Sequence, residues 1–180
     1  MALPRELALT EAQIDELMTT QWNMRIATIG PRDRINVTPM WFGWGGGRVY
    51  FFGRGQKIAN LRRNRTCTVI VDRNERFPEL QAVMIQGRGI VLEDAAAEAA
   101  DPHLPAVRKQ MGIKYNGGHG RAPHDDPPPN SATAGGRSRR WVVVEPEHVV
   151  TWDNFKLPLL AEQQHAKRQT QKPQQQQRKG

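Results

Sequence analysis

Cysteine is almost absent from this sequence of 180 residues, with Cys67 the only one. A single cysteine excludes a disulfide or a cysteine-based metal site within one chain. It stands in the apolar run 67–71, where a thiol behaves as a small buried hydrophobe. Long apolar runs are missing too: no stretch approaches the roughly 18 residues of a membrane span, and the N-terminus carries no secretion signal. We therefore expect a cytoplasmic protein without a membrane segment.

The glycine motifs of nucleotide-binding proteins are also missing. The glycines at 53 and 55 lack the spacing of a Walker loop, and no Gly-x-Gly-x-x-Gly precedes a predicted helix. The sequence therefore argues against nucleoside triphosphate chemistry.

Charge and composition indicate one folded unit followed by a basic tail. The chain has 26 Lys and Arg against 18 Asp and Glu, a net charge of +8, so a polyanionic partner must be considered. Much of the excess lies in a Gln-rich terminus typical of a solvated tail. We expect an N-terminal helix in 1–23, one domain over 24–160 and a disordered tail over 161–180. Nucleic-acid binding through that tail is a remote alternative.

Hydrophobic patterning predicts a mainly β domain. Alternation and turn residues predict six strands, over 24–29, 35–42, 48–52, 66–72, 81–92 and 140–152. The glycine run 43–47 is assigned to a hairpin loop. Gly87 and Gly89 interrupt the longest strand, where glycine marks a bend or a close approach of another group. The arrangement favours an antiparallel barrel or sandwich.

Four helical stretches are expected beside the strands. Amphipathic spacing predicts helices over 10–20, capped by Thr10, and over 57–64. Two further helices are expected over 93–100 and 104–115. The helices are short, so we expect them to pack against the sheet and not to form a separate layer.

A Gly- and Pro-rich segment at 116–138 is expected to be a mobile loop. It contains residue types that can bind a metal, namely His119, His124, Asp125 and Asp126. No second cluster of such residues accompanies them, so no metal site is predicted.

The most informative segment surrounds Lys57. A lysine in the first turn of a helix is disfavoured, because the positive end of the helix dipole and unpaired N–H groups lie there. A phosphate would accept from those groups and pair with Lys57 and Arg54, while Gly53 and Gly55 let the backbone come close. A plain glycine turn with Lys57 in water fits the local physics equally well.

Family resemblance decides between these alternatives. The strings RIATIGPRDRINVTPMWFGWGGGRVYFFGRGQKIANLRRNRTCTVIVD, VMIQGRGIVLED and RRWVVVEPEHVVTWD follow one another in this order. They resemble the pyridoxamine 5′-phosphate oxidase-like flavin-binding split barrels, particularly the actinobacterial flavin/deazaflavin oxidoreductases. The resemblance implies a six-stranded antiparallel split β-barrel with Greek-key topology and a few short helices. It also implies a homodimer with two cofactor sites at the subunit interface.

The resemblance further implies a set of cofactor contacts. The edge of the isoalloxazine or deazaflavin ring would be contacted by Thr38, Pro39, Met40 and Trp41. The phosphate would be held by Gly53, Arg54, Gly55 and Lys57. Gln86 and Trp152 would reach the site from the partner chain. The cofactor would be FMN or coenzyme F-420, and the basic surface favours F-420 because its oligoglutamate tail is acidic.

The activity implied is hydride transfer between the cofactor ring and a small organic substrate. Such chemistry belongs to the cofactor, which agrees with the lack of a convincing catalytic triad or carboxylate pair, and no catalytic residue is predicted. A C-terminal Arg-rich substrate signature is not recognisable, which argues against vitamin B6 oxidation. The alternative from another functional class is a non-catalytic flavin or haem carrier or sensor.

Overall fold

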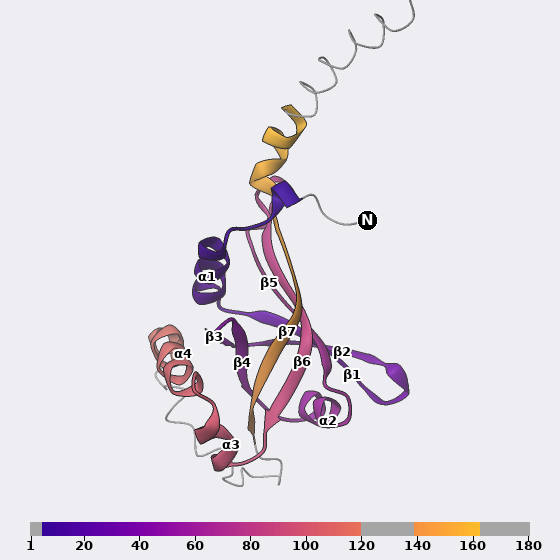
Figure 1. The fold of residues 1–180 in the computed structure, drawn as a ribbon, viewed down its shortest axis with the longest axis vertical. Coiled ribbons are helices and arrows are strands. Elements are labelled where there is room, and N and C mark those ends of the chain that lie inside the picture. Colours follow the sequence, from indigo (N-terminus) through magenta and orange to yellow (C-terminus); the bar gives the residue numbers. More distant parts are fainter. Residues whose placement is uncertain (1–4, 120–138, 163–180) are drawn as a thin grey trace, which may run out of the picture.

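The computed structural model of the chain describes residues 5–119 and 139–162. These residues form one curled antiparallel sheet of seven strands in the order β2-β1-β5-β6-β7-β4-β3 (Figure 1). The strands are Met24–Ile29 (β1), Ile35–Met40 (β2), Gly43–Gly45 (β3), Arg48–Gly53 (β4), Thr66–Arg73 (β5), Gln81–Leu92 (β6) and Arg140–Asp153 (β7). The predicted mainly β, antiparallel class with a few short helices is confirmed, and the sheet is curled into a half-barrel.

The predicted number of six strands is wrong, because β3 adds a seventh. Gly43 and Gly45 were expected in a loop, but β3 pairs antiparallel with the start of β4, with Gly45 opposite Arg48. Only Gly46 and Gly47 form the turn, with φ angles of 58° and 71°. Two successive positive φ angles match the twist of a two-residue hairpin, so the rest of the glycine run is free to extend the sheet.

The helices are Glu11–Thr20 (α1), Gln56–Arg63 (α2), Ala95–Ala100 (α3) and Leu104–His119 (α4), with short 3-10 segments at Arg5–Leu7, Pro31–Asp33, Phe77–Glu79 and Asn154–Lys156. Thr10 caps α1 as predicted, in a reciprocal capping box with Gln13. Because α4 runs to His119, the first residues of the segment predicted as a loop are helical. The rest of that segment, and the tail from 163, lie outside the described residues. Within the described part of the chain, no helix is long and apolar enough to cross a membrane.

The interior of the half-barrel forms the main core. Its members come from most strands and from α1 and α2, whose apolar faces close it at the two ends. Fully buried examples are Leu17, Met18, Ile26, Phe51, Leu61, Val69, Ile85 and Val142. Burial of these side chains is the main stabilising contribution, at roughly 1.5–3 kcal/mol for each large aliphatic or aromatic one.

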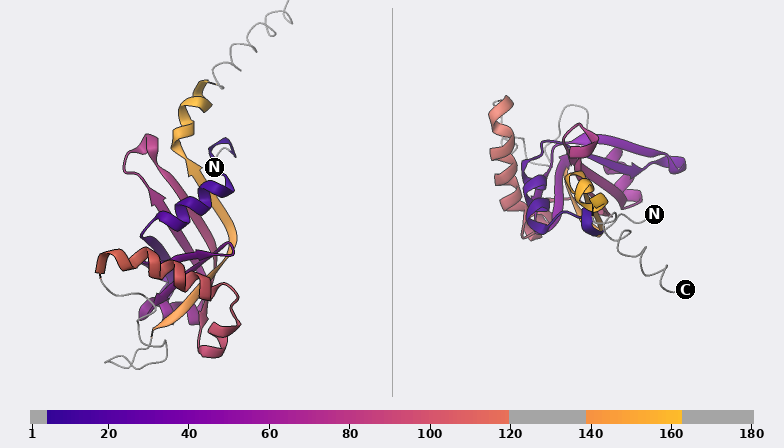
Figure 2. Two further views of the ribbon diagram at one scale, coloured as in Figure 1. Left: turned by 90° about the vertical axis from the view of Figure 1, so that its left-hand side faces the viewer. Right: turned by 90° about the horizontal axis from the view of Figure 1, so that it is seen from above.

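A second core lies between the outer face of β4 and β7 and the helices α3 and α4. Tyr50 and Trp141 pack there against Leu104, Val107 and other residues of α4. The helix α4 can approach β3 closely because the glycines of β3 have no side chains. A Cβ on Gly43 would lie 2.5 Å from Val107 Cγ1. The right view of Figure 2 shows α4 on the side of the sheet opposite the β1–β2 hairpin.

The glycines in β6 mark close approaches, as predicted. The β6–β7 ladder shifts register between Gln86 and Gly87, and a Cβ on Gly87 would collide with the carbonyl oxygen of Glu145. A Cβ on Gly89 would lie 2.7 Å from Leu61 Cδ2, so α2 rests directly on β6 at this point. Glycine is therefore required for backbone packing at both positions.

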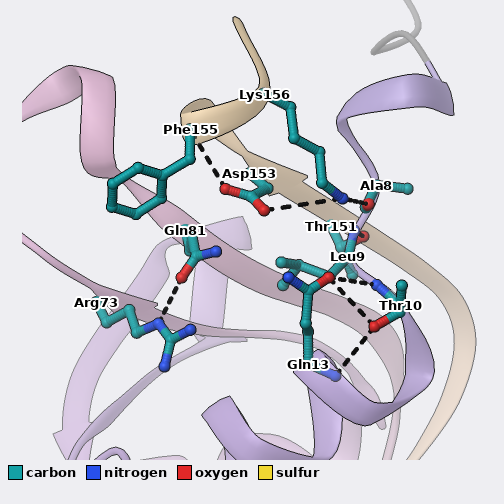
Figure 3. Close-up of polar contacts among 10 residues, drawn as sticks. All are labelled: Ala8, Leu9, Thr10, Gln13, Arg73, Gln81, Thr151, Asp153, Phe155 and Lys156. Carbon is teal, nitrogen blue, oxygen red and sulfur yellow. Dashed lines mark hydrogen bonds and ion pairs between the residues drawn. The ribbon is translucent and has the colours of Figure 1, made fainter. Parts of the chain in front are cut away.

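The N-terminal segment is fastened to the end of β7 by polar contacts (Figure 3). The amide of Leu9 donates to Thr151 Oγ1 at 3.0 Å, and Lys156 Nζ donates to the carbonyl oxygen of Ala8 at 2.5 Å. The buried carboxylate of Asp153 accepts from the amide of Phe155 at 3.2 Å. These bonds fix the approach to α1, and with it one end of the barrel core.

Candidate functional site

The N-terminus of α2 is an uncapped helix end. Its N-cap residue, Gly55, has φ 80° and ψ −147°, and no side chain accepts from the first turn. That turn also lacks an acidic residue. A Cβ built on Gly55 would meet nothing within 4 Å, so space is open above it. Unpaired N–H groups together with the positive end of the helix dipole make such a terminus suited to an anion.

Lys57 lies in this first turn and is half-buried. Its Nζ donates to the carbonyl oxygen of Arg54 at 3.1 Å. Burial lowers the pKa of Lys57, and the positive charge of Arg54 lowers that pKa further. Both causes disfavour the charged amine, and a bound anion would stabilise that charge. The structure thus brings Gly53, Arg54, Gly55 and Lys57 together in one turn, as expected from their sequence positions.

Two arginines stand at the start of β7, beside the end of β4. Arg140 lies opposite Gly53 in the β4–β7 ladder, and its Nε is 3.6 Å from Glu93 Oε2. The guanidinium of Arg139 lies 5.8 Å from the centre of the Phe52 ring. Neither arginine was among the predicted site residues. Their position directly before the last strand was visible in the sequence, but its pairing with the end of β4 was not.

The end of β2 lies beside the end of β4. Met40 is half-buried against the barrel core, and its Cε would be 3.4 Å from a Cβ on Gly53. Thr38, two residues earlier, is also half-buried, whereas Pro39 between them is exposed. Thr38 and Met40, two of the residues predicted to contact the cofactor ring, therefore lie on one side of β2, close to the predicted phosphate turn.

A chain of polar side chains, buried at Asn60 and Thr28, links α2 to β2. Gln56 Nε2 donates to Asn60 Oδ1 at 2.8 Å, and Asn60 Nδ2 donates to Thr28 Oγ1 at 3.0 Å. Thr28 pairs with Asn36 in the β1–β2 ladder, and Asn36 Oδ1 accepts from Thr38 Oγ1 at 3.3 Å. Sequence reasoning missed this chain. The available signal was Asn60, a polar residue on the apolar face of an amphipathic helix.

Trp41 follows β2 and is 39% exposed. Its ring is stacked on that of Tyr115 of α4, with ring centres 4.5 Å apart and planes 5° from parallel. The sequence offered Trp41 as a site residue but gave no reason to connect it with Tyr115, which lies far along the chain in another element.

Gln86 and Trp152 are not brought to Lys57 within one chain. Gln86 is exposed, whereas its neighbours Ile85 and Gly87 are buried. Since side chains alternate along a strand, Gln86 points away from the face on which Leu61 of α2 packs at Gly89. Trp152 lies opposite Ala82, on the same face of the sheet as Gln86.

Metal ligands do not gather in the described parts of the chain, where no group of three or more His, Cys, Asp or Glu residues could hold an ion. His124, Asp125 and Asp126 of the 116–138 segment lie outside the described residues, as does the side chain of His119. Cys67 is buried, and burial raises the pKa of its thiol to about 12.

Comparison with known proteins identifies the region of the chain that contains the sheet and the turn around Lys57. Residues 10–153 match the family model described as pyridoxamine 5′-phosphate oxidase. This match spans every strand of the sheet and the turn around Lys57. No curated protein sequence matches the chain.

Solved structures of similar fold come from several bacteria. A conserved hypothetical protein from Mycobacterium tuberculosis has a TM-score of 0.69 and 22% identity, covering 88% of this chain and 93% of its own. A FAD-binding protein from Mesorhizobium loti has a TM-score of 0.53 and 18% identity, covering 80% and 93%. The haem storage protein of Vibrio cholerae has a TM-score of 0.57 and 14% identity, covering 79% and 94%. At these identities the likeness concerns the fold.

Proposed function

The chain belongs to the pyridoxamine 5′-phosphate oxidase family, and we propose that it is an oxidoreductase that binds a flavin or deazaflavin phosphate. The observation that carries this proposal is the uncapped N-terminus of α2, where Gly55 leaves open space and Lys57 has no acidic partner among the residues that the structure describes. A phosphate group at this turn would accept from the first-turn N–H groups and pair with the Lys57 ammonium.

Several cations support the choice of a phosphate. Burial and the positive charge of Arg54 both lower the pKa of Lys57, and Arg140 lies opposite Gly53. A phosphate at this turn would favour the charged form of Lys57 and raise the pKa of that amine. The residues present therefore fit the phosphate end of the cofactor in charge, in hydrogen-bond donors and in space.

The ring end of the cofactor would lie at the end of β2, with contacts from Thr38, Pro39, Met40 and Trp41. Met40 lies next to Gly53, so both ends of the site are within one region of the barrel. When bound, the ring supplies the hydride chemistry, and the protein binds it, orients it and excludes water. The polar chain through Asn60 holds the phosphate turn in a set position relative to β2.

Coenzyme F-420 is our preferred cofactor over FMN. The two share the ring shape and the first phosphate, but F-420 carries additional acidic groups in its oligoglutamate tail. Arg54 and Lys57 give the phosphate turn positive charge, and the whole chain carries a net charge of +8. An extended anion would make use of this charge.

We further propose that the active form is a homodimer. Gln86 and Trp152 lie on a face of the sheet that is turned away from α2. If they contact the cofactor, they do so in the site of a second copy. Val37 of β2 lies on the same face of the sheet as Gln86 and is 60% exposed, so it is an apolar side chain that a partner would cover.

Two proteins of similar fold indicate the range of ligands to test. One binds FAD, which contains the flavin ring and its phosphate, and the other stores haem. Because the second protein stores haem, a non-catalytic carrier is our alternative function. The two functions differ in turnover: a carrier would hold its ligand without substrate-dependent oxidation or reduction.

The proposal is tested by titrating the full chain separately with FMN, F-420 and haem, following the absorbance of each ligand. We expect saturable binding of F-420 or FMN below millimolar concentration, and binding of F-420 more tightly than FMN. Binding of haem alone would support the carrier, and absence of binding by both FMN and F-420 would overturn the proposed function.

A further inference from the structure

Lys114 of α4 has a buried amine that plays no part in the cofactor site described so far. Its Nζ is closed off from solvent and makes no hydrogen bond with the described residues. The amine lies 4.1 Å from the centre of the Phe42 ring and 5.4 Å from that of Tyr115. Aromatic faces attract a cation but carry no net negative charge. Within the part of the chain that the structure describes, this amine is therefore a buried donor without an acidic partner.

The surroundings of the amine leave its positive charge uncompensated. Burial raises the pKa of the neighbouring Tyr115 hydroxyl to about 12, so that side chain stays neutral. On α1, which packs beside α4 on β3, Asp15 accepts from the indole of Trp44 at 2.7 Å. Burial lowers the pKa of Lys114 to about 8, because an unpaired charge in the interior is costly. Negative charge that arrives nearby would stabilise the ammonium.

Aromatic rings connect this amine with the segment proposed to border the cofactor ring. Phe42 directly follows Trp41, and its amide nitrogen and carbonyl oxygen both lie 3.0 Å from the Tyr115 hydroxyl. The Tyr115 ring is stacked 4.5 Å from the Trp41 ring and lies 5.4 Å from Lys114 Nζ, so the amine is at most about 10 Å from the centre of the Trp41 ring. Phe42 and Tyr115 are both fully buried. Charges separated by such a dry region are screened weakly.

We propose that Lys114 stabilises the negative charge that the cofactor ring gains when it is reduced. This inference rests on the proposed function, in which the segment from Thr38 to Trp41 borders that ring. A hydride taken from the substrate brings two electrons and one proton to the ring and makes its charge more negative by one unit, while the substrate is oxidised by two electrons. The ammonium of Lys114 favours this more negative ring, and the aromatic side chains keep screening water out.

The consequence is a preference for the reduced cofactor. Two unit charges roughly 12 Å apart, at an effective dielectric constant of about 20, attract each other by an amount that corresponds to about a tenfold change in an equilibrium constant. We therefore expect Lys114 to strengthen binding of the reduced cofactor about tenfold more than binding of the oxidised one. By linkage, the reduced cofactor raises the pKa of Lys114 more than the oxidised cofactor does.

The first test measures the Kd of the oxidised and of the chemically reduced cofactor for the full chain, anaerobically and near pH 7, with whichever of FMN or F-420 binds. Lys114→Met keeps an apolar side chain and removes the charge, so the ratio of oxidised to reduced Kd should fall about tenfold. Lys114→Arg keeps a charge and should retain most of the ratio. A purely structural role would change both Kd values together and leave the ratio unaltered.

Lys109→Met is the matched control for net charge, because Lys109 is an exposed lysine of the same helix. We expect its ratio of oxidised to reduced Kd to equal that of the wild type. Circular dichroism verifies that each variant is folded.

A second test needs no variant. The lysine side chains of the wild type, labelled with carbon-13, are followed by NMR from about pH 7 to about pH 11, first with the oxidised and then with the reduced cofactor. We expect the pKa of Lys114 to be higher with the reduced cofactor. Above that pKa the amine is neutral, so the preference for the reduced cofactor should fade as pH rises.

The outcomes separate this inference from the function on which it rests. Equal ratios in wild type and Lys114→Met, or an equal pKa of Lys114 with both forms of the cofactor, overturn the role of Lys114 while cofactor binding stands. An equal fall in Lys109→Met and Lys114→Met would assign the effect to net charge and also overturns it. Absence of saturable binding of both oxidised FMN and oxidised F-420 by the wild type would overturn the proposed function itself.

Discussion

The side-chain amide of Asn60 donates a 3.0 Å hydrogen bond to the hydroxyl of Thr28 inside the barrel. Both groups are almost fully buried, Asn60 at 0% and Thr28 at 1% exposure. The bond connects α2 with β1. It fixes where the first turn of α2, including Lys57, lies relative to the strand that pairs with β2.

Replacing Asn60 should therefore destabilise the fold. Asn60→Leu takes the donor away from the Thr28 hydroxyl, which keeps only its 3.5 Å bond to the carbonyl oxygen of Asn36, and losing a buried hydrogen-bond partner costs about 1–3 kcal/mol. Urea denaturation measures the loss in the free energy of unfolding. The double variant Asn60→Leu with Thr28→Val makes both positions apolar and should recover part of the loss. A double variant less stable than the sum of both single changes would contradict this account.

Lys57 should be required for cofactor affinity. Lys57→Ala removes a charge-assisted hydrogen bond to the proposed phosphate, worth about 1.5–3 kcal/mol, which corresponds to roughly a 10- to 100-fold weaker Kd. Lys109→Ala, an exposed lysine of α4, is the control for the change in net charge. Titration with FMN and F-420 measures both variants. Equal cofactor affinities of the two variants would show that Lys57 does not take part in cofactor binding.

Lys114 should make stability depend on alkaline pH. Its Nζ is buried, lies 4.1 Å from the centre of the Phe42 ring and has no hydrogen-bond partner in the described residues. Burial lowers the pKa of Lys114 to about 8. An unfolded lysine has a pKa of about 10.4, so between these values the unfolded chain binds more protons and folding becomes more favourable as pH rises.

The measurement compares wild type with Lys114→Met by urea denaturation from about pH 7 to about pH 10, a range that spans the titration of this amine. We expect the wild type to gain stability relative to the variant as pH rises through the pKa of Lys114. The effects of Tyr50, Tyr115 and other groups cancel in the difference. Parallel profiles for the two proteins would show that the amine is not desolvated.

Gly87 should not tolerate a side chain. Its Cβ would collide with the carbonyl oxygen of Glu145, and a backbone atom cannot rotate away. We expect Gly87→Ala to cost about 3 kcal/mol, the upper range for overpacking. Gly47→Ala is the control: φ is 71° and no atom lies within 4 Å, so it should cost only about 1 kcal/mol of backbone strain. Thermal unfolding of both variants tests the order, and equal melting temperatures would contradict it.

Local signals in the sequence were sufficient for much of the fold. Alternation located the strands, and Thr10 was correctly predicted as a helix cap because capping depends on residues within one turn. Glycines in β6 were correctly predicted to mark close approaches. The glycine run at β3 misled the prediction, because glycine permits a turn but does not require one; pairing with β4 decided the outcome.

Local patterns and motif order were sufficient to assign the family, the mainly β class and the glycine-flanked helix start at Lys57. Tertiary structure alone decided which distant residues meet. Asn60 reaches Thr28, Arg140 lies opposite Gly53, and Tyr115 lies on Trp41 only because strand pairing and helix packing bring them together. Such contacts depend on the register of the whole sheet, which no local pattern encodes.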